Sequence, residues 1–265
     1  MGVHPFKDRT AFVTGGASGI GRAIAREFGS RGLQVVVADI DLAGAEAVAA
    51  EIPGASAVAL DVRAEDNWAA ALDLAEARHG PLAVLVSNAG VAGPTMPLVD
   101  TGLKAWEWTR SINLDGAFIG LTQGARRIIA TGRPGHIVAT ASMSVFEMQP
   151  RMGTYVACKA GVVALADALR HELGDHPIGV SVLLPGPVQT RLIEANAGRA
   201  PAGLGIGAKE AGQADRLRDG LDPAEVGRQV ADALGTDRFW LFTHPELEYR
   251  IDTRTAELKR ALHRG

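Results

Sequence analysis

The sequence predicts an α/β fold, a Rossmann-like doubly wound parallel sheet of about seven strands with helices on both faces. Short apolar runs alternate with stretches of helical periodicity along most of the chain. The runs are apolar almost throughout, which is typical of strands buried on both faces. A glycine-rich turn joins the first run to the first helical stretch. Because parallel strands end at one edge of the sheet, we expect ligands to bind beyond that edge.

The predicted strands are near-continuous apolar segments at residues 10–14, 34–39, 57–60, 82–86, 135–140, 178–184 and 238–242. The predicted helices carry apolar residues at helical spacing and lie at residues 19–31, 42–51, 64–79, 102–131, 153–174 and 222–234. With 265 residues, of which 47% are hydrophobic, the chain can bury one full core. We therefore expect residues 1–265 to form a single domain.

The turn after the first strand reads Gly15-Gly-Ala-Ser-Gly-Ile-Gly21 and has the spacing G-x-x-x-G-x-G. Glycines let the backbone approach a pyrophosphate closely, and the free N–H groups of a helix start favour an anion. The spacing differs from the commoner dinucleotide motif G-x-G-x-x-G, and the turn lacks the lysine of G-x-x-x-x-G-K-[ST]. We predict that a dinucleotide binds here. The alternative is a turn that serves packing only.

The second predicted strand ends in an acid, Asp39. A carboxylate at this place can accept hydrogen bonds from both ribose hydroxyls of an adenosine, and it repels a 2′-phosphate. Neither Ser18 nor Ile40, the two neighbouring positions, supplies a cation for such a phosphate. NAD is therefore predicted rather than NADP. The alternative is that Asp39 only caps the next helix, a role that Asp41 can equally fill.

Tyr155 and Lys159 stand four residues apart in a predicted helix and share one of its faces. A free phenol has a pKa of ~10, and lowering it by ~2 to 3 units needs ~3 to 4 kcal/mol of preferential phenolate stabilisation. One cation at about 4 Å contributes on the order of 4 kcal/mol, and an oxidised nicotinamide ring adds positive charge. Ser142, thirteen residues before the tyrosine, is predicted to hold a substrate oxygen, with Ser144 as the alternative. Taken alone, such a Tyr-x-x-x-Lys pair also arises by chance.

Together these motifs resemble the short-chain dehydrogenase/reductase family over nearly all of residues 6–245. Each motif is modestly specific, whereas the ordered set is very hard to obtain by chance. The markers are Thr14-Gly-Gly-Ala-Ser-Gly-Ile-Gly21, Asp61-Val62, Asn88-Ala-Gly90, Asn113, Ser142, Tyr155, Lys159, Pro185-Gly186 and Thr190. One departure is Ser87, which stands where the family usually has a first asparagine.

The resemblance implies a catalytic set of four residues. Tyr155 matches the acid/base, and Lys159 matches the residue that lowers the tyrosine's pKa and binds the nicotinamide ribose. Ser142 matches the residue that positions the substrate oxygen, and Asn113 the one that supports a proton-relay water.

For the cofactor, the resemblance implies that Asp61 and Val62 bracket the adenine, residues 88–90 line the floor and Thr190 touches the carboxamide. The full set of predicted cofactor contacts is Gly15, Ser18, Gly19, Ile20, Gly21, Asp39, Asp61, Val62, Asn88, Ala89, Gly90, Tyr155, Lys159, Pro185, Gly186, Val188 and Thr190.

These residues predict an NAD-dependent oxidoreductase that interconverts a secondary alcohol and a ketone. A bulky, mainly apolar substrate is expected, because apolar side chains flank the predicted site: Met143, Phe146, Met148, Met152 and residues 91–96. These methionines can equally be ordinary core. One alternative function is a reductase of ketones or 3-oxoacyl thioesters. Another is a non-catalytic NAD sensor or scaffold, against which the intact catalytic set argues.

The segment 191–220 is rich in glycine and alanine and follows Pro185-Gly186 at the expected cofactor site. We interpret it as a substrate lid; the alternative is a loose surface insertion. Cys158, next to Lys159, is expected to be buried and inert, because a free cysteine behaves as a small hydrophobe. The alternative is a site that is sensitive to thiol reagents.

A net charge of −3 and a pI near 6.2 give no reason to expect nucleic acid or a membrane surface as a partner. No apolar run reaches the ~20 residues of a membrane span, and residues 1–8 lack the apolar segment of a secretory signal, so a cytoplasmic location is expected. One cysteine excludes an internal disulfide, and no metal site is predicted. Arginines near the C-terminus alternate with acids, which indicates a solvated helix face.

The family resemblance implies a homotetramer or homodimer packed through the helices at 102–131 and 153–174. The second of these helices carries a stripe of small residues that permits close approach, Ala157, Ala160, Ala164 and Ala168.

Overall fold

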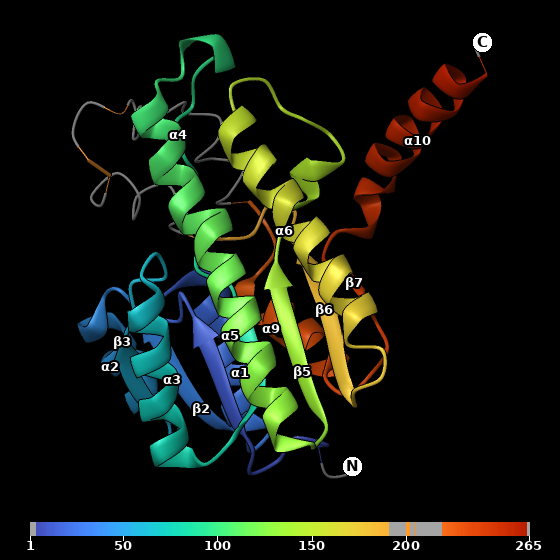
Figure 1. Cartoon of the computed structure of the whole chain (residues 1–265). Coiled ribbons are helices and arrows are strands. Elements are labelled where there is room, and N and C mark those ends of the chain that lie inside the picture. The colour runs from blue at the N-terminus through green and yellow to red at the C-terminus, as the bar shows by residue number, and fades with distance from the viewer. Residues whose placement is uncertain (1–3, 191–199, 202–203, 205–218, 264–265) are drawn as a thin grey trace.

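The computed structural model describes residues 4–190, 200, 201, 204 and 219–263 (Figure 1). Within them, seven parallel strands form one sheet in the order β3-β2-β1-β4-β5-β6-β7, which confirms the predicted doubly wound fold. The strands are β1 (Thr10–Thr14), β2 (Gln34–Asp39), β3 (Ser56–Ala59), β4 (Leu82–Ser87), β5 (Gly135–Thr140), β6 (Ile178–Leu184) and β7 (Trp240–Phe242). Every predicted strand is present, with ends within two residues of those expected.

The helices that alternate with the strands in the described part of the chain are α1 (Gly19–Ser30), α2 (Leu42–Ala50), α3 (Glu65–His79), α4 (Leu103–Arg110), α5 (Gly116–Thr131), α6 (Gly153–Glu172), α9 (Pro223–Ala233) and α10 (Glu248–Leu262). The stretch predicted as one helix at 102–131 contains a wider turn, because the π-helical segment Ser111–Asp115 joins α4 to α5. Asp222 caps α9 by accepting a hydrogen bond from Ala224 N–H, and proline follows at the first helical position.

Helices cover both faces of the sheet (Figure 1), and one hydrophobic core lies on each face. Strand side chains alternate between them: Phe12 packs with α3, α5 and α6, whereas its neighbours on β1 pack with α1, α2 and α9. Trp68 of α3 is fully buried in the first core, and Phe28 of α1 in the second. Burying a large side chain of this kind contributes about 1.5–3 kcal/mol, so both faces fix the sheet firmly.

Strand order reverses between β1 and β4, and the site must therefore lie beyond the carboxyl ends of these strands, at the top in Figure 1. The C-terminal helix α10 stands away from the body and has no buried residue among those described, as its charged sequence indicates. Its base is tied to the carboxyl edge by an ion pair from Arg250 to Glu147 at 2.7 Å. No helix of the described chain is long and apolar enough to cross a bilayer.

Candidate active site

The glycine turn between β1 and α1 needs its glycines for steric reasons. Gly15 and Gly19 have φ values of +65° and +52°, a region that favours glycine. A Cβ on Gly21 would lie 2.1 Å from the Gly15 carbonyl oxygen, and one on Gly15 would lie 2.9 Å from Ala89 Cα. The turn is therefore pressed against the segment that follows β4.

Asn88 joins three strands at this edge. Its backbone N–H donates to Thr14 Oγ1 at 2.9 Å, and its side-chain amide donates to the Thr14 carbonyl at 3.0 Å. Its amide oxygen accepts from the Thr140 hydroxyl at 3.3 Å. The side chain of Asn88 thus holds β1, β4 and β5 in register, so the predicted cofactor floor depends on Asn88 for its shape.

Asp39 is 7% exposed and lies beside the glycine turn. Its carboxylate accepts backbone N–H groups of Ala17 at 3.1 Å and of Asp41 at 3.0 Å. The cap of α2 is instead Asp41, whose side chain accepts from Gly44 N–H. Asp39 is therefore not the helix cap that the alternative interpretation required, and its place suits the predicted contact with a ribose.

Asp61 and Val62 follow β3, as expected for residues near an adenine. The Arg63 guanidinium makes a two-pronged ion pair with Asp61, at distances of 2.6 to 3.1 Å. This pairing lowers the pKa of the Asp61 carboxyl. Val62 is buried, and its carbonyl accepts from the indole N–H of Trp68 at 3.0 Å. Sequence reasoning missed Arg63, although an arginine two residues after an acid is a visible signal.

A cavity of about 270 Å³ opens at the start of α1. It is lined by Ala17, Ser18, Gly19, Arg22, Ala23, Gln189, Thr190 and Pro223. A Cβ on Gly19 would lie 3.0 Å from Thr190 Cγ2, so the segment after β6 meets the glycine turn here. Ser18 is the N-cap residue but makes no side-chain cap bond to described residues. Bare glycines, a helix start and this cavity fit the pyrophosphate of a dinucleotide.

Tyr155 and Lys159 lie on α6 with the lysine near the tyrosine ring. Lys159 Nζ is 5.9 Å from the ring centroid and donates to the Thr140 carbonyl at 2.8 Å. Lys159 is 5% exposed, and this burial lowers its pKa to about 8. Because this pKa is still above 7, most of the Lys159 ammonium remains charged at neutral pH, but a larger fraction is neutral than in an exposed lysine.

Ser142 is the serine that interacts with Tyr155, and this contact favours Ser142 over Ser144 as the predicted holder of a substrate oxygen. Ser144 instead donates its backbone N–H and its hydroxyl to Ser142 Oγ, at 3.2 and 3.0 Å. Burial raises the pKa of the Tyr155 phenol, and the hydrogen bond with Ser142 opposes that rise. The lowered pKa expected from Lys159 is thus not a property of the protein without cofactor, because desolvation of the phenolate is the larger effect.

Asn113 lies in the π-helical segment and is 1% exposed. Its side chain makes two 2.7 Å hydrogen bonds with the backbone of Val91, accepting the N–H and donating to the carbonyl. A Cβ on Gly90 would lie 2.9 Å from Asn113 Oδ1 and 3.4 Å from Lys159 Nζ. Asn113, Gly90 and Lys159 are therefore brought together, and the wider turn places the asparagine.

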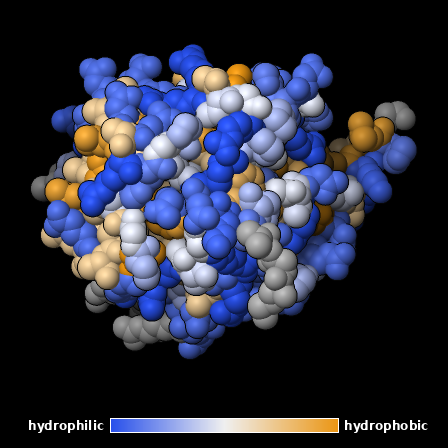
Figure 2. All heavy atoms as spheres, turned by 90° about the horizontal axis from the view of Figure 1, so that it is seen from below, coloured by the Kyte–Doolittle hydropathy of each residue, from blue (hydrophilic) through white to orange (hydrophobic). Residues whose placement is uncertain are grey.

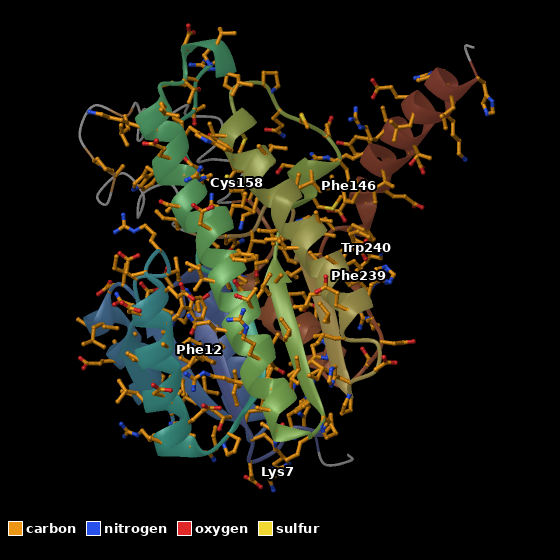
Figure 3. The ribbon with its side chains drawn as sticks, viewed as in Figure 1. Lys7, Phe12, Phe146, Cys158, Phe239 and Trp240 are labelled. Carbon is orange, nitrogen blue, oxygen red and sulfur yellow. The ribbon has the colours of Figure 1, made fainter. Side chains whose placement is uncertain are left out.

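The apolar side chains expected near the substrate differ in their burial. Met143 is 2% exposed and belongs to the core, and Phe146 packs toward β7, with ring centroids 6.5 Å from Trp240 and 6.0 Å from Phe242 (Figure 3). Met143 is thus not free to line a pocket, whereas Phe146 is half-buried and keeps part of its surface exposed. Met148 is 67% exposed. The predicted lid at 191–220 falls almost wholly outside the described residues.

Cys158 is fully buried on α6, as expected (Figure 3). Burial raises the pKa of its thiol to about 11, which disfavours the reactive thiolate. Among the residues that the structure describes, no group of three or more His, Cys, Asp or Glu side chains is arranged to hold a metal ion.

Two residues that sequence reasoning missed lie directly after β7. Thr243 accepts the Gly186 N–H at 3.1 Å, and the His244 ring lies against the same glycine. The available signal was their place at the carboxyl end of the last parallel strand, where functional side chains gather.

A family model described as short chain dehydrogenase matches residues 9–199. The chain is 31% identical over 257 residues to the C alpha-dehydrogenase of Sphingobium sp. strain SYK-6, across 93% of this chain and 84% of that relative. It is 34% identical over 260 residues to the 1-deoxy-11-beta-hydroxypentalenate dehydrogenase of Streptomyces avermitilis, across 96% and 92%. A solved short chain dehydrogenase/reductase from Burkholderia phymatum, in complex with NAD, has a TM-score of 0.89 and 28% identity and covers 98% of this chain and 97% of its own.

Proposed function

The chain belongs to the short-chain dehydrogenase/reductase family, and on that premise we propose that it is an NAD-dependent oxidoreductase that interconverts a secondary alcohol and a ketone. The observation that carries the proposal is the convergence of Lys159, Asn113 and Gly90 beside the Tyr155–Ser142 pair. This set lies at the carboxyl edge of the sheet, where ligands of doubly wound folds bind. Dehydrogenase names among the relatives support the same reaction class.

The residues at the edge of β1 and β2 fit NAD. The glycine turn and the cavity at the start of α1 would hold the pyrophosphate, and Asp39 would accept the adenosine ribose hydroxyls. Arg22 also lines this cavity, but its guanidinium is paired with Glu51 at 2.6 Å, so this cation is already partly neutralised. A 2′-phosphate would meet the Asp39 carboxylate, and we therefore propose NAD over NADP.

The chain's own residues would move the proton. Bound NAD supplies the hydride acceptor and positive charge near the phenol. Tyr155 would take the hydroxyl proton of the alcohol, and Ser142 would hold the same oxygen. Lys159, fixed by its bond to the Thr140 carbonyl, would stabilise the phenolate. Because burial alone raises the pKa of Tyr155, we propose that the tyrosine becomes a base only when the cofactor is bound.

We propose a bulky, mainly apolar alcohol as substrate, of the aryl or alicyclic kind. Large apolar side chains lie exposed near the start of α6: Leu98, Val99, Leu103 and Met148. Leu98 is close to the catalytic helix, because a Cβ on Gly153 would lie 3.3 Å from Leu98 Cδ1. Apolar surface of this kind suits a substrate without a fixed charge.

The test is a panel of secondary alcohols offered with NAD and with NADP side by side. We expect steady-state NADH formation, fastest with aryl or alicyclic alcohols, and much slower turnover with NADP. A reverse panel of ketones and 3-oxoacyl thioesters with NADH tests the reductase alternative. Tight NAD binding without turnover of any compound would refute the proposal and favour an NAD sensor.

We also propose a homotetramer or homodimer that packs through α5 and α6. Phe118 on α5 is 52% exposed. The small side chains predicted to permit close approach on α6 are exposed as well, at Ala157, Ala160, Ala164 and Ala168. Light scattering of the purified protein tests this assembly, and a monomer would refute it.

A further inference from the structure

The turn that follows β6 is fastened to its surroundings by hydrogen bonds from several directions. Leu221 donates its N–H to the Pro187 carbonyl and accepts from Gln189 N–H, both at 2.9 Å. Met143 N–H donates to the Pro185 carbonyl at 3.0 Å. These three bonds join backbone to backbone and are therefore not removed by changing a side chain.

A fourth bond has a side chain as its acceptor. Gly186 N–H donates to Thr243 Oγ1 at 3.1 Å, and Thr243 is 4% exposed. The same hydroxyl lies 2.6 Å from Nδ1 of His244. Because Oγ1 accepts from the glycine, its own proton needs an acceptor, and an imidazole nitrogen without hydrogen provides one. Both bonds are satisfied when the imidazole carries its hydrogen on Nε2.

His244 also lies directly against the turn. A Cβ on Gly186 would lie 2.7 Å from Cγ and Nδ1 of the imidazole. The ring therefore occupies the space that any other residue at 186 would need. This contact fixes His244, and His244 in turn directs the Thr243 hydroxyl.

The turn connects this pair to the reaction centre. The Pro185 carbonyl is bonded to Met143, which directly follows Ser142 in the chain. The same turn continues to Val188 and Thr190, two of the predicted cofactor contacts. A shift of Gly186 is thereby passed both to the serine that faces Tyr155 and to the cofactor side.

We propose that Thr243 and His244 are positioning residues that fix the turn at Gly186 and thereby set the placement of Ser142 and of the cofactor-contacting residues that follow. The proposal rests on the function proposed above for the same site. Neither residue takes part in proton or hydride transfer. Their effect is to hold a backbone segment whose other hydrogen bonds named above, within the described residues, are made by the main chain.

Hydrogen exchange of the cofactor-free protein tests the tether directly. Thr243→Val removes the hydroxyl and keeps the side-chain shape, and Thr243→Ser keeps the hydroxyl as the matched control. A net hydrogen bond of about 1 kcal/mol corresponds to a several-fold change in local opening. We expect amide exchange at Gly186 to rise about fivefold in T243V and to stay within about twofold in T243S. Unchanged exchange in T243V would overturn the proposal.

Cofactor affinity and turnover test the consequence. We expect T243V to raise the Kd for NADH, measured by fluorescence titration, about fivefold and to lower kcat about tenfold. T243S should stay within about twofold of the wild type in both quantities, with similar thermal unfolding of all three proteins. Equal losses in T243S and T243V, or no loss in T243V, would overturn the proposal.

A second pair of variants covers the case in which T243V does not fold. His244→Phe removes the acceptor, whereas His244→Asn places an amide oxygen near the position of Nδ1. We expect H244N to recover most of the NADH affinity that H244F loses. Equal NADH affinity in the two variants would count against the positioning role of Thr243 and His244. If the wild type turned over no alcohol, the proposed function would fail, while exchange and NADH affinity would still decide the positioning role.

Discussion

The two edges of the parallel sheet use polar side chains in different ways. At the amino edge, His136 is fully buried and its Nε2 lies 2.9 Å from Ser181 Oγ. Ser181 donates to the Arg238 carbonyl at 2.6 Å, and Gly235 N–H donates to His136 Nδ1 at 3.2 Å. These polar groups are bonded inside the fold, and the surface seen from this edge is largely hydrophilic (Figure 2).

At the carboxyl edge, ionisable groups also lie where desolvation makes their charge costly, but these groups face the predicted ligand site. Burial raises the pKa of Tyr155 and lowers that of Lys159 to about 8. Hydrogen-bonded pairing at the amino edge thus contributes stability, whereas the carboxyl edge keeps groups whose protonation a bound ligand can change. Substitutions at the two edges should therefore affect different measurements.

The largest effect is expected at the carboxyl edge, from Tyr155→Phe. Removing the proposed acid/base should lower kcat about 10³-fold, because positioned proton transfer contributes about 10² to 10⁴. NADH affinity and thermal unfolding should stay close to those of the wild type. Steady-state kinetics measures the loss of kcat, and fluorescence titration measures the NADH affinity. Near-normal turnover of this variant would exclude Tyr155 as the base.

At the amino edge, we expect stability rather than activity to change, and to change with pH. Burial lowers the pKa of His136 from 6.5 to about 4, so the unfolded chain binds a proton more readily than the folded protein. The neutral, buried His136 therefore contributes roughly 3 kcal/mol to the free energy of unfolding. This contribution is complete above pH ~6.5 and is lost as the pH falls toward ~4. Urea unfolding at several pH values measures it.

His136→Asn should flatten this pH dependence, since asparagine does not titrate. The matched control is His171→Asn, because the His171 side chain is 71% exposed and should leave the pH dependence almost unchanged. If the free energy of unfolding changed equally with pH in the wild type and H136N between pH 4 and 6.5, a group other than His136 would dominate this pH dependence.

An intermediate effect is expected for cofactor choice. Asp39→Asn keeps an acceptor for the Ala17 N–H but removes the charge that faces a 2′-phosphate. The preference for NAD over NADP should fall about 10- to 100-fold, in line with ~1.5–3 kcal/mol for hydrogen bonds to a charged group. The control is Asp41→Asn, which changes the cap of α2. Unchanged kcat/KM ratios for the two cofactors in D39N would rule out the ribose role.

The smallest effect is expected at Cys158, also near the carboxyl edge. Its thiol is fully buried and its pKa is raised to about 11, so thiol reagents should neither label the folded protein nor inhibit it. Labelling followed during urea unfolding should coincide with loss of structure. Rapid inactivation of the native protein would show that this thiol is more accessible than its burial indicates.

Much of the fold followed from local sequence pattern. Apolar runs located every strand, because a strand buried on both faces must be apolar over its whole length. The turn at Ser111–Asp115 was not predicted, since a π-helical segment leaves the apolar spacing of the surrounding helix nearly unchanged. The contact between Phe146 and Trp240 was not predicted either, because the two residues are distant in sequence.

By itself, the sequence determined the alternation of strands and helices, the glycine turn and the shared face of Tyr155 and Lys159. Each of these depends on spacing along the chain. Three properties required the folded structure: the contact of Ser142 with the tyrosine, the rise of the phenol's pKa on burial, and the bond from Gly186 to Thr243. Burial and contact between distant segments set these properties, because desolvation and hydrogen-bond partners depend on what the fold brings together.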